Sequence, residues 1–346
     1  MHKYSVKNWI LPVLDAKTRH PTNRRSLILP LGILMCVSML SVVFAITQGS
    51  VNLSPYAVWQ ALLGQGSGLN QTLVLELRLP RVMAAFATGG LLAVAGALMQ
   101  ILLRNPLADP YVLGISGGAS VAALAAILLG ISGVLMSGMA FLGAVLSTLL
   151  VFGLSARLGN TATMRLLLTG VVIAAGWGAL ITLMLALAPP HKIPGMLYWL
   201  MGDLSYASTP WLAWLVLVPT CLILMPLGRS LNVLARGPLQ AAALGVNVKS
   251  LERFVFLLAS LLTAIAVTTA GSVGFVGLVI PHMLRMVLGN DQRLILPASA
   301  LAGGCLVTLA DTLARTVIAP EQLPVGVITA LLGVPTFLYL LQRGRL

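Results

Sequence analysis

The chain has 346 residues, of which 58% are apolar and only 8% are charged, and its mean hydropathy is +0.99. This composition excludes a soluble globular domain and predicts an all-α polytopic membrane protein. The net charge of +13 could suggest a nucleic-acid partner, but the basic residues lie in short segments between apolar runs, where membrane topology explains them. No nucleic acid is therefore expected as a partner.

The N-terminal region predicts a cytoplasmic tail. Residues 1–26 carry six basic residues and one acid, and the uncharged run 27–46 that follows is long enough to span a bilayer. Basic residues keep their segment on the cytoplasmic side. A cleaved signal peptide is the alternative, but the polar lead is long and no small-residue cleavage site follows it. We expect a tail of residues 1–26 and one permease domain of residues 27–346.

The rest of the chain predicts ten transmembrane helices with both termini in the cytoplasm. The uncharged run 110–156 is too long for one span and fits two, with the glycine-rich residues 130–138 as the turn. The proline-rich segment 189–194 is expected to form an outer loop, and residues 229–253 the largest inner loop. The spans lie in residues 27–46, 82–103, 110–156 (two), 166–188, 204–228, 254–284 (a span and a short helix starting near Gly274), 294–310 and 323–341.

Two consequences follow from ten spans. Spans 2–5 and 7–10 are offset by an odd number, so they would cross the membrane in opposite senses, as in the inverted repeats of transporters. Of the 21 lysines and arginines, only four would lie outside: Arg78, Arg81, Lys192 and Arg315. Because basic residues favour the cytoplasmic side, the outer arginines need another reason, and docking of an acidic partner is one.

Six motifs follow one another in a characteristic order. They are Arg78-Leu-Pro-Arg81, Arg104-Asn-Pro-Leu-Ala-Asp-Pro110, Gly114-Ile-Ser-Gly-Gly118, Gly274-Phe-Val-Gly-Leu-Val-Ile-Pro-His282, Ala310-Asp-Thr-Leu-Ala-Arg315 and Leu323-Pro-Val-Gly326. Together they closely resemble the FecCD-type permeases, the membrane subunits of ABC importers for iron siderophores, haem and vitamin B12. The resemblance covers about residues 27–346.

This resemblance implies a homodimer in a bacterial cytoplasmic membrane, with the substrate path along the dimer axis. Two ATPase subunits would bind the inner face, and a soluble two-lobed substrate-binding protein the outer face. The permease itself would be no enzyme and hold no cofactor. ATP-Mg would be bound by the ATPase, and the chain contains no Gly-x-x-x-x-Gly-Lys-Ser/Thr phosphate-binding motif of its own. An iron-siderophore or similar chelate is the expected cargo; vitamin B12 or haem is the alternative, and a heterodimer with a paralogue stays open.

The outer arginines gain a role from the resemblance. Family arginines that match Arg78, Arg81 and Arg315 receive glutamates of the binding protein. Planar guanidinium groups pair bidentately with carboxylates and steer charged partners together. The structural alternative is that Arg78 and Arg81 anchor the start of span 2 at the headgroups, while Arg315 pairs with Asp311 one helical turn earlier.

The inner loop 229–253 resembles the family's ATPase-coupling segment. The matched positions are Gly237, Ala241, Leu244, Gly245 and Val246. The chain departs from the family pattern at Pro238, where an acidic residue is usual, and at Ala243, where a basic one is frequent. The alternative is a solvated basic loop that obeys the positive-inside rule.

A second family position concerns the cytoplasmic gate. Asn105 and Leu107 match residues that close the path at its inner end, although Asn105-Pro106 could simply end the helix and start a turn. Asp109 could cap the next helix. The resemblance also places span 166–188 along the path, without a cargo signature.

The sequence gives little support for a catalytic site or a metal site. The tetrapeptide Gly114-Ile115-Ser116-Gly117 fits the short serine motif of rhomboid-type intramembrane proteases, with His282 as a conceivable base, but serines in glycine-rich helices usually serve packing. His282 itself is expected to be a buried residue without a ligand role. The three cysteines are far apart and lack ligand spacing, so no metal site is expected.

Overall fold

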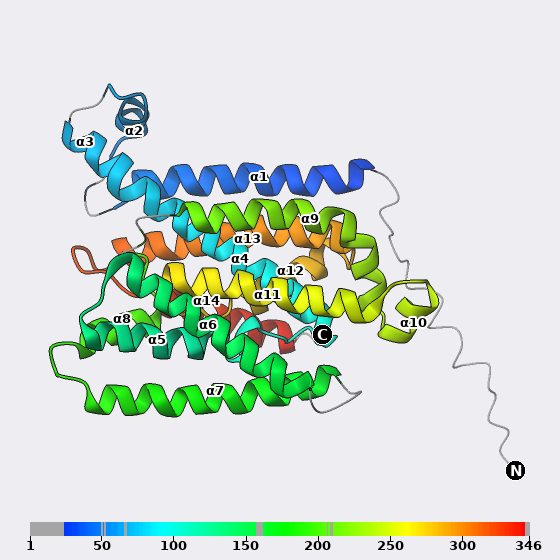
Figure 1. The fold of residues 1–346 in the computed structure, drawn as a ribbon. Helices are drawn as coiled ribbons and strands as arrows, with labels where there is room; N and C mark the ends of the chain where they lie inside the picture. Colours follow the sequence, from blue (N-terminus) through cyan, green and yellow to red (C-terminus); the bar gives the residue numbers. More distant parts are fainter. Residues whose placement is uncertain are drawn as a thin grey trace, which may run out of the picture.

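The computed structural model describes residues 24–342 apart from 50, 52, 66, 67, 157–161, 206, 208 and 209. Nearly all of the expected N-terminal tail and the basic residues Arg343 and Arg345 lie outside the described part. The described residues form helices and connecting turns, without a strand. The long helices run roughly side by side (Figure 1), and two ends can be distinguished. We call them the α2 end, where α1 finishes and α2 and α3 lie, and the α10 end, opposite to it.

The helices follow the chain in this order: α1 (Arg24–Thr47), α2 (Pro55–Leu62), α3 (Gly68–Thr72), the π-helical turn η3 (Leu73–Arg78), α4 (Leu79–Leu103), the 3₁₀ turn η4 (Pro110–Leu113), α5 (Ile115–Leu129), α6 (Gly133–Ala156), α7 (Ala162–Leu187), α8 (Ile193–Met201), α9 (Trp211–Ala235), α10 (Pro238–Ala243), α11 (Val248–Ala270), α12 (Val276–Leu288), α13 (Gln292–Thr316) and α14 (Val325–Gln342).

The chain is a multi-pass membrane protein by the length and hydropathy of these helices. Seven described helical segments are long and apolar enough to cross a bilayer, and three shorter apolar helices, α5, α12 and α14, accompany them. Each falls in a region where the sequence predicts a span. Ten complete crossings and the cytoplasmic position of both termini stay predictions.

Three boundaries differ from the sequence-based expectation. The glycine-rich turn is shorter than residues 130–138, because α6 already starts at Gly133. The expected loop around Pro194 contains α8, since proline is well suited to the first turn of a helix. Helix α9 starts at Trp211 and continues to Ala235, so the connection to α11 is only residues 236–247.

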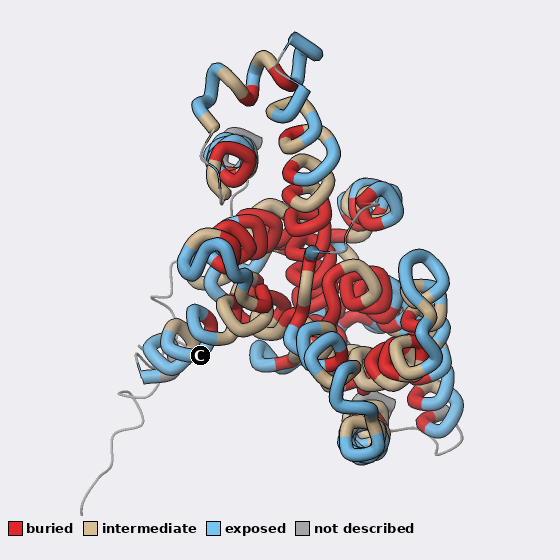
Figure 2. The backbone as a smooth tube through the Cα atoms, turned by 90° about the vertical axis from the view of Figure 1, so that its left-hand side faces the viewer, coloured by how far each residue is buried: buried red, intermediate tan, exposed pale blue. Residues whose placement is uncertain are grey.

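Helix α4 is the centre of the bundle. It packs against α13, α11, α12 and α9, and buried residues gather around it while exposed ones line the peripheral helices (Figure 2). Two glycines permit the closest approaches. A Cβ on Gly89 would lie 2.1 Å from the carbonyl oxygen of Gly303 in α13, and one on Gly96 would lie 1.9 Å from that of Gly277 in α12. Backbones can approach this closely only where side chains are absent.

A polar side chain completes the contact between α4 and α12. Pro281 lacks the N–H that would serve the carbonyl of Gly277 one turn earlier. Gln100 of α4 takes that role, because its Nε2 donates to the oxygens of Gly277 (3.3 Å) and Leu278 (3.2 Å). Its Oε1 in turn accepts from Arg285 of α12. The amide thus satisfies a backbone group that the proline leaves without a partner.

Candidate functional site

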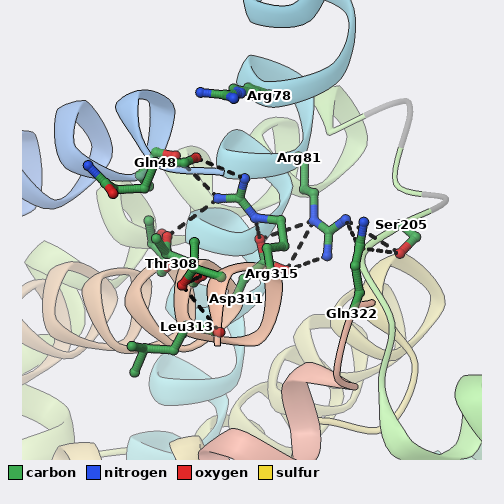
Figure 3. A network of polar contacts seen from close by, with 12 residues as sticks. Gln48, Arg78, Arg81, Ser205, Thr308, Asp311, Leu313, Arg315 and Gln322 are labelled. Atoms are coloured by element: carbon green, nitrogen blue, oxygen red, sulfur yellow. Dashed lines mark hydrogen bonds and ion pairs between the residues drawn. The ribbon is translucent and has the colours of Figure 1, made fainter. Parts of the chain in front are cut away.

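Two arginines, Arg81 and Arg315, bind one carboxylate at the α2 end, and a third, Arg78, lies near them (Figure 3). Asp311 of α13 has a side chain only 1% exposed. Arg81, in the first turn of α4, donates to it through Nη2 (2.8 Å) and Nε (3.1 Å to each oxygen). Arg315, four residues after Asp311 on α13, donates through Nε at 3.0 Å. Asp311 is therefore shared by two guanidinium groups from two helices.

The remaining donors of this cluster hold the end of α1. Arg78 donates through Nη1 to the carbonyls of Ile46 (2.8 Å) and Thr47 (3.1 Å), and Arg315 through Nη2 to that of Ala45 (3.2 Å). The last four carbonyls of a helix have no partner within it, and its C-terminus carries partial negative charge. Arg78 and Arg315 thus act as side-chain caps of α1.

Lys192 follows the same rule elsewhere at this end. Its Nζ donates to the carbonyl of Leu128 at 2.6 Å, in the last turn of α5. Three of the four cations that were predicted to depart from the positive-inside pattern, Arg78, Lys192 and Arg315, therefore cap helix C-termini. Only Arg81 does not. The sequence contained no direct signal for this, because the capped carbonyls are distant in the chain.

Local sequence explains how Arg78 and Arg81 come to these positions. The helix that begins at Gly68 changes to π geometry over Leu73–Arg78, directly before Pro80 in the first turn of α4. The N–H of Leu79 bonds to the carbonyl of Val74, five residues earlier, as a π turn requires. Single π turns of this kind are frequent at functional sites.

The structure brings the three predicted docking arginines together, but with unequal access. Arg78 and Arg315 are buried, while the side chain of Arg81 is 13% exposed and reaches the exposed residues Ser205 and Gln322. The pairing of Arg315 with Asp311 that the sequence offered as an alternative is present. Three arginines against one aspartate leave an excess of positive charge in the cluster.

The predicted coupling segment forms the α10 end. Pro238 occupies the first turn of α10, and Gly245, with φ of +79°, ends it. Val246 N donates to the carbonyl of Ala241, and Gly245 N to that of Ala242, both at 3.0 Å. This is the Schellman arrangement, in which a glycine in left-handed conformation terminates a helix. The departure at Pro238 is therefore compatible with a short helix here.

Side chains of this segment divide into an inner and an outer set. Ala241 is fully buried, whereas Leu244 is 70% exposed. Leu239, which is not among the positions that match the family's coupling segment, is 85% exposed. The α10 end therefore exposes one leucine on the short helix and another directly after it.

The predicted gate residues form a turn at the α10 end of α4. Asn105 Oδ1 accepts from Leu107 N at 2.9 Å, and the Asn105 carbonyl accepts from Ala108 N at 3.1 Å. This local bonding is what an Asn-Pro turn requires. Leu107 is exposed, and a gating role stays a prediction.

Next to this turn lies an open depression with a volume of about 400 Å³, lined by Asp109, Tyr111, Val112, Gly274, Phe275 and Leu278. Asp109 Oδ1 accepts from Tyr111 N at 2.7 Å, so Asp109 caps η4, as expected of a helix start. Burial raises the pKa of the Asp109 carboxyl to about 6, although the bond from Tyr111 N lowers it. Its charge is therefore only weakly favoured.

The residues of the protease alternative do not meet. Ser116 Oγ donates to Ser272 Oγ at 3.2 Å, and His282 has the ring of Phe337 as its aromatic neighbour. Among the described hydrogen bonds, none joins Ser116 to His282. Nor do the described residues contain a group of three or more His, Cys, Asp or Glu side chains placed to hold a metal ion.

Comparisons with known proteins agree with this architecture. The hemin transport system permease protein of Yersinia pestis is 39% identical over 325 residues, which cover 92% of this chain and 96% of that protein. The vitamin B12 import system permease protein of Vibrio cholerae is 41% identical over 330 residues, 93% and 95% of the two chains. A solved metal-chelate type ABC transporter in an inward-facing conformation superposes with a TM-score of 0.80 at 29% identity, over 90% of this chain and 98% of that one.

The FecCD transport family matches residues 36–343, which include every described helix from within α1 to α14. Four of the six motifs that suggested this family contribute to the arginine cluster, the Asn-Pro turn or the α4–α12 contact. The chain belongs to the FecCD transport family and is an ABC transporter permease.

Proposed function

We propose that this chain is the membrane subunit of a binding-protein-dependent importer that moves an iron-siderophore or similar metal chelate into the cytoplasm by ATP-driven alternating access. The observation that carries the proposal is the family match over residues 36–343. Vitamin B12 or haem is the second candidate cargo, because curated relatives named for each are about equally similar. The two ends of the bundle have the different surfaces that such a machine requires.

In this proposal the α2 end faces outward and the α10 end faces the cytoplasm of a bacterial cell. The chain would cross the membrane ten times as an inverted repeat, with both termini inside. The test is labelling of single cysteines, at Gln65 and at Ala243 in a variant without native cysteines, by a membrane-impermeant maleimide on intact spheroplasts. Only Gln65→Cys should react; reaction of both sites would contradict the topology.

The arginine cluster would receive the substrate-binding protein. Asp311 is paired with Arg81 and Arg315, and Arg78 lies beside them without a carboxylate partner in the described contacts, so the cluster keeps an excess of positive charge that favours an acidic partner. Arg81 is the residue for the direct contact, because Arg78 and Arg315 also hold α1. Glutamate at Arg78 or Arg315 would disturb folding as well as docking, so Arg81→Gln is the cleaner variant.

The α10 end would couple to the ATPase subunits, which bind ATP-Mg. Leu239 and Leu244 would insert into a cleft of each ATPase, while Ala241 and Val246 keep α10 against the bundle. Leu244→Asp should leave folding unchanged, since this side chain is exposed, and uncouple ATP hydrolysis from uptake. Unchanged transport by this variant would contradict the assignment.

A second copy of the chain would complete the path. Helix α7 (Ala162–Leu187) lies at the periphery and leaves most of its apolar surface uncovered, including Val172 and Leu183. We assign this surface to the dimer axis, where it would line the path, with Asn105 and Leu107 closing the cytoplasmic end. No residue is assigned as a ligand of the cargo.

Uptake in cells that lack this chain tests the function. Radiolabelled iron would be supplied as several siderophores and as haem, and cobalamin would be supplied with its own label. Loss of one iron chelate, restored by the gene, would support the main proposal and name the cargo. Loss of cobalamin or haem uptake alone would select the second candidate, and no loss of any would contradict the substrate class.

A further inference from the structure

The guanidinium of Arg81 is divided between two directions. Its Nε and Nη2 face Asp311 inside the bundle. Its Nη1 faces the surface, where it donates to Gln322 Oε1 at 2.7 Å and lies 3.4 Å from Ser205 Oγ (Figure 3). One edge of this arginine is thus committed to the fold, and the other is directed at a surface group.

Two donors meet at the same surface oxygen. Ser205 Oγ also donates to Gln322 Oε1, at 3.3 Å. A neutral amide oxygen therefore occupies a point at which a guanidinium N–H and a hydroxyl converge. A carboxylate oxygen at that point would form a shorter and stronger, charge-assisted bond with Arg81.

The backbone that carries Gln322 is held in place, whereas the Gln322 side chain is not. The backbone around Gln322 is fixed by Leu323 N, which donates to the Ala314 carbonyl at 2.9 Å, and by Tyr198 Oη, which donates to the Gln322 carbonyl at 3.4 Å. The Gln322 side chain itself is exposed, as is Ser205. The amide can therefore rotate away into solvent without any change in the chain that carries it.

The other outer cations do not offer such a point. Arg78, Lys192 and Arg315 each donate to carbonyls near the end of α1 or in the last turn of α5. Displacing them would leave helix carbonyls without partners, which costs free energy. Displacing Gln322 from Arg81 exposes only an amide that water can solvate.

We propose that Arg81 Nη1 and the Ser205 hydroxyl form a seat for a single carboxylate of the docking protein, and that Gln322 occupies this seat while the permease is free. The inference rests on the proposed docking function and adds Ser205 and Gln322 to it. Asp203, which accepts from Ser205 N at 2.7 Å, and the exposed Glu321 next to Gln322 would repel further negative charge. The seat therefore selects an isolated carboxylate rather than an acidic run.

A pair of substitutions at one position tests the seat. Gln322→Glu would place a tethered carboxylate on the two donors and compete with the partner, whereas Gln322→Ala would leave the seat empty. The assembled permease with its ATPases, in lipid nanodiscs, would be titrated with the binding protein that supports uptake by this permease. We expect the Kd to rise about tenfold for Gln322→Glu and to stay within about twofold, or fall, for Gln322→Ala.

A control separates the seat from general repulsion. Gln65→Glu adds the same charge at another exposed glutamine of the α2 end and should change the Kd by less than about twofold. Equal effects of Gln322→Glu and Gln65→Glu, or equal losses for Gln322→Glu and Gln322→Ala, would overturn the seat.

Arg81→Gln distinguishes failure of the inference from failure of the docking proposal. If it weakens docking while Gln322→Glu does not, docking at Arg81 stands and the seat is wrong. If neither changes the Kd, docking at this cluster is wrong as well. The salt dependence adds a readout that a merely structural role would not change, because Gln322→Glu should flatten it relative to the parent chain.

Discussion

Helices α4 and α7 are nearly equal in hydropathy and opposite in environment. In the apolar 18-residue window of the segment that contains α4, mean hydropathy is 2.0 and 94% of the residues are buried, whereas in that of α7 mean hydropathy is 2.2 and 6% are buried. Hydropathy decides whether a helix enters a membrane, since lipid tails are as apolar as leucine. It does not decide whether the neighbour is lipid or another helix.

Glycines in the two helices show what makes the difference. Those of α4 lie against backbone of α12 and α13, whereas of the three glycines of α7 only Gly170 meets a neighbouring backbone, that of η4, and Gly176 and Gly178 have no atom near the place of a Cβ. Helix α4 also carries Arg81 and Gln100, whose partners lie on other helices. Shape and polar pairing, rather than apolar content, place α4 at the centre.

The largest expected effect comes from Gly96→Ala. The new methyl group would lie 1.9 Å from the Gly277 carbonyl, so the backbones of α4 and α12 must separate. We expect a loss of about 3 kcal/mol or more in unfolding free energy, or no folded protein. SDS-titrated unfolding in mixed micelles measures this. Gly178→Ala is the matched control on α7 and should be neutral; equal losses would remove the distinction between the helices.

The second largest effect is expected from Asp311→Asn. It keeps the size of the side chain but leaves Arg81 and Arg315 facing each other without a buried negative charge. We expect a loss of about 2–3 kcal/mol in the same unfolding assay. Glu76→Gln, at an exposed position of the same end, should change little. A stability equal to that of the parent chain would show that the shared carboxylate is not needed.

Gln100→Leu tests the polar contact between α4 and α12. It would leave the Gly277 carbonyl, which Pro281 cannot serve, without a donor, and Arg285 without its amide acceptor. The expected loss is about 1–2 kcal/mol by SDS titration. Thr182→Val on α7 removes only an exposed bond of Thr182 Oγ1 to the Gly178 carbonyl and serves as the control. A larger loss of unfolding free energy for Thr182→Val than for Gln100→Leu would contradict the view that α4 depends more than α7 on polar contacts.

The smallest effect is a pH dependence at the turn that follows α4. The folded pKa of Asp109, about 6, exceeds its ordinary value of 3.8, so the folded state binds more protons between these values. Stability should therefore fall as pH rises through this window. Asp109→Asn keeps an acceptor for Tyr111 N and removes the charge, so this variant should be more stable than the parent chain at pH 7.5 and about equal to it near pH 4. Thermal unfolding at the two pH values would show it, and a gain independent of pH would contradict it.

Much of the fold was accessible from sequence because uncharged runs of sufficient length have few alternatives to a membrane helix. The regions of α1, α4, α7, α13 and α14 were predicted, and two helices were correctly expected in residues 110–156. Helix α8 was missed because prolines were interpreted as a loop. The inner connection is shorter than expected, because hydropathy falls where α9 leaves the apolar region while its backbone hydrogen bonding continues to Ala235.

For the candidate site, the sequence singled out Arg78, Arg81 and Arg315 by their exception to the positive-inside rule. It could not show that Arg78 and Arg315 cap α1, because the capped carbonyls are backbone groups with no identity in the sequence. It missed Gln322 and Ser205 because isolated polar residues in loops carry no pattern, and Leu239 because one apolar residue on a six-residue helix carries none either.

By itself, then, the sequence determined the class, the helical regions and the family, since these depend on composition, run length and ordered motifs. Only the tertiary structure decided which apolar helix became the core and which arginine directs one side of its guanidinium group to the surface. Both depend on contacts between segments more than 100 residues apart, such as Arg81 with Asp311, and no local property of the chain encodes such a contact.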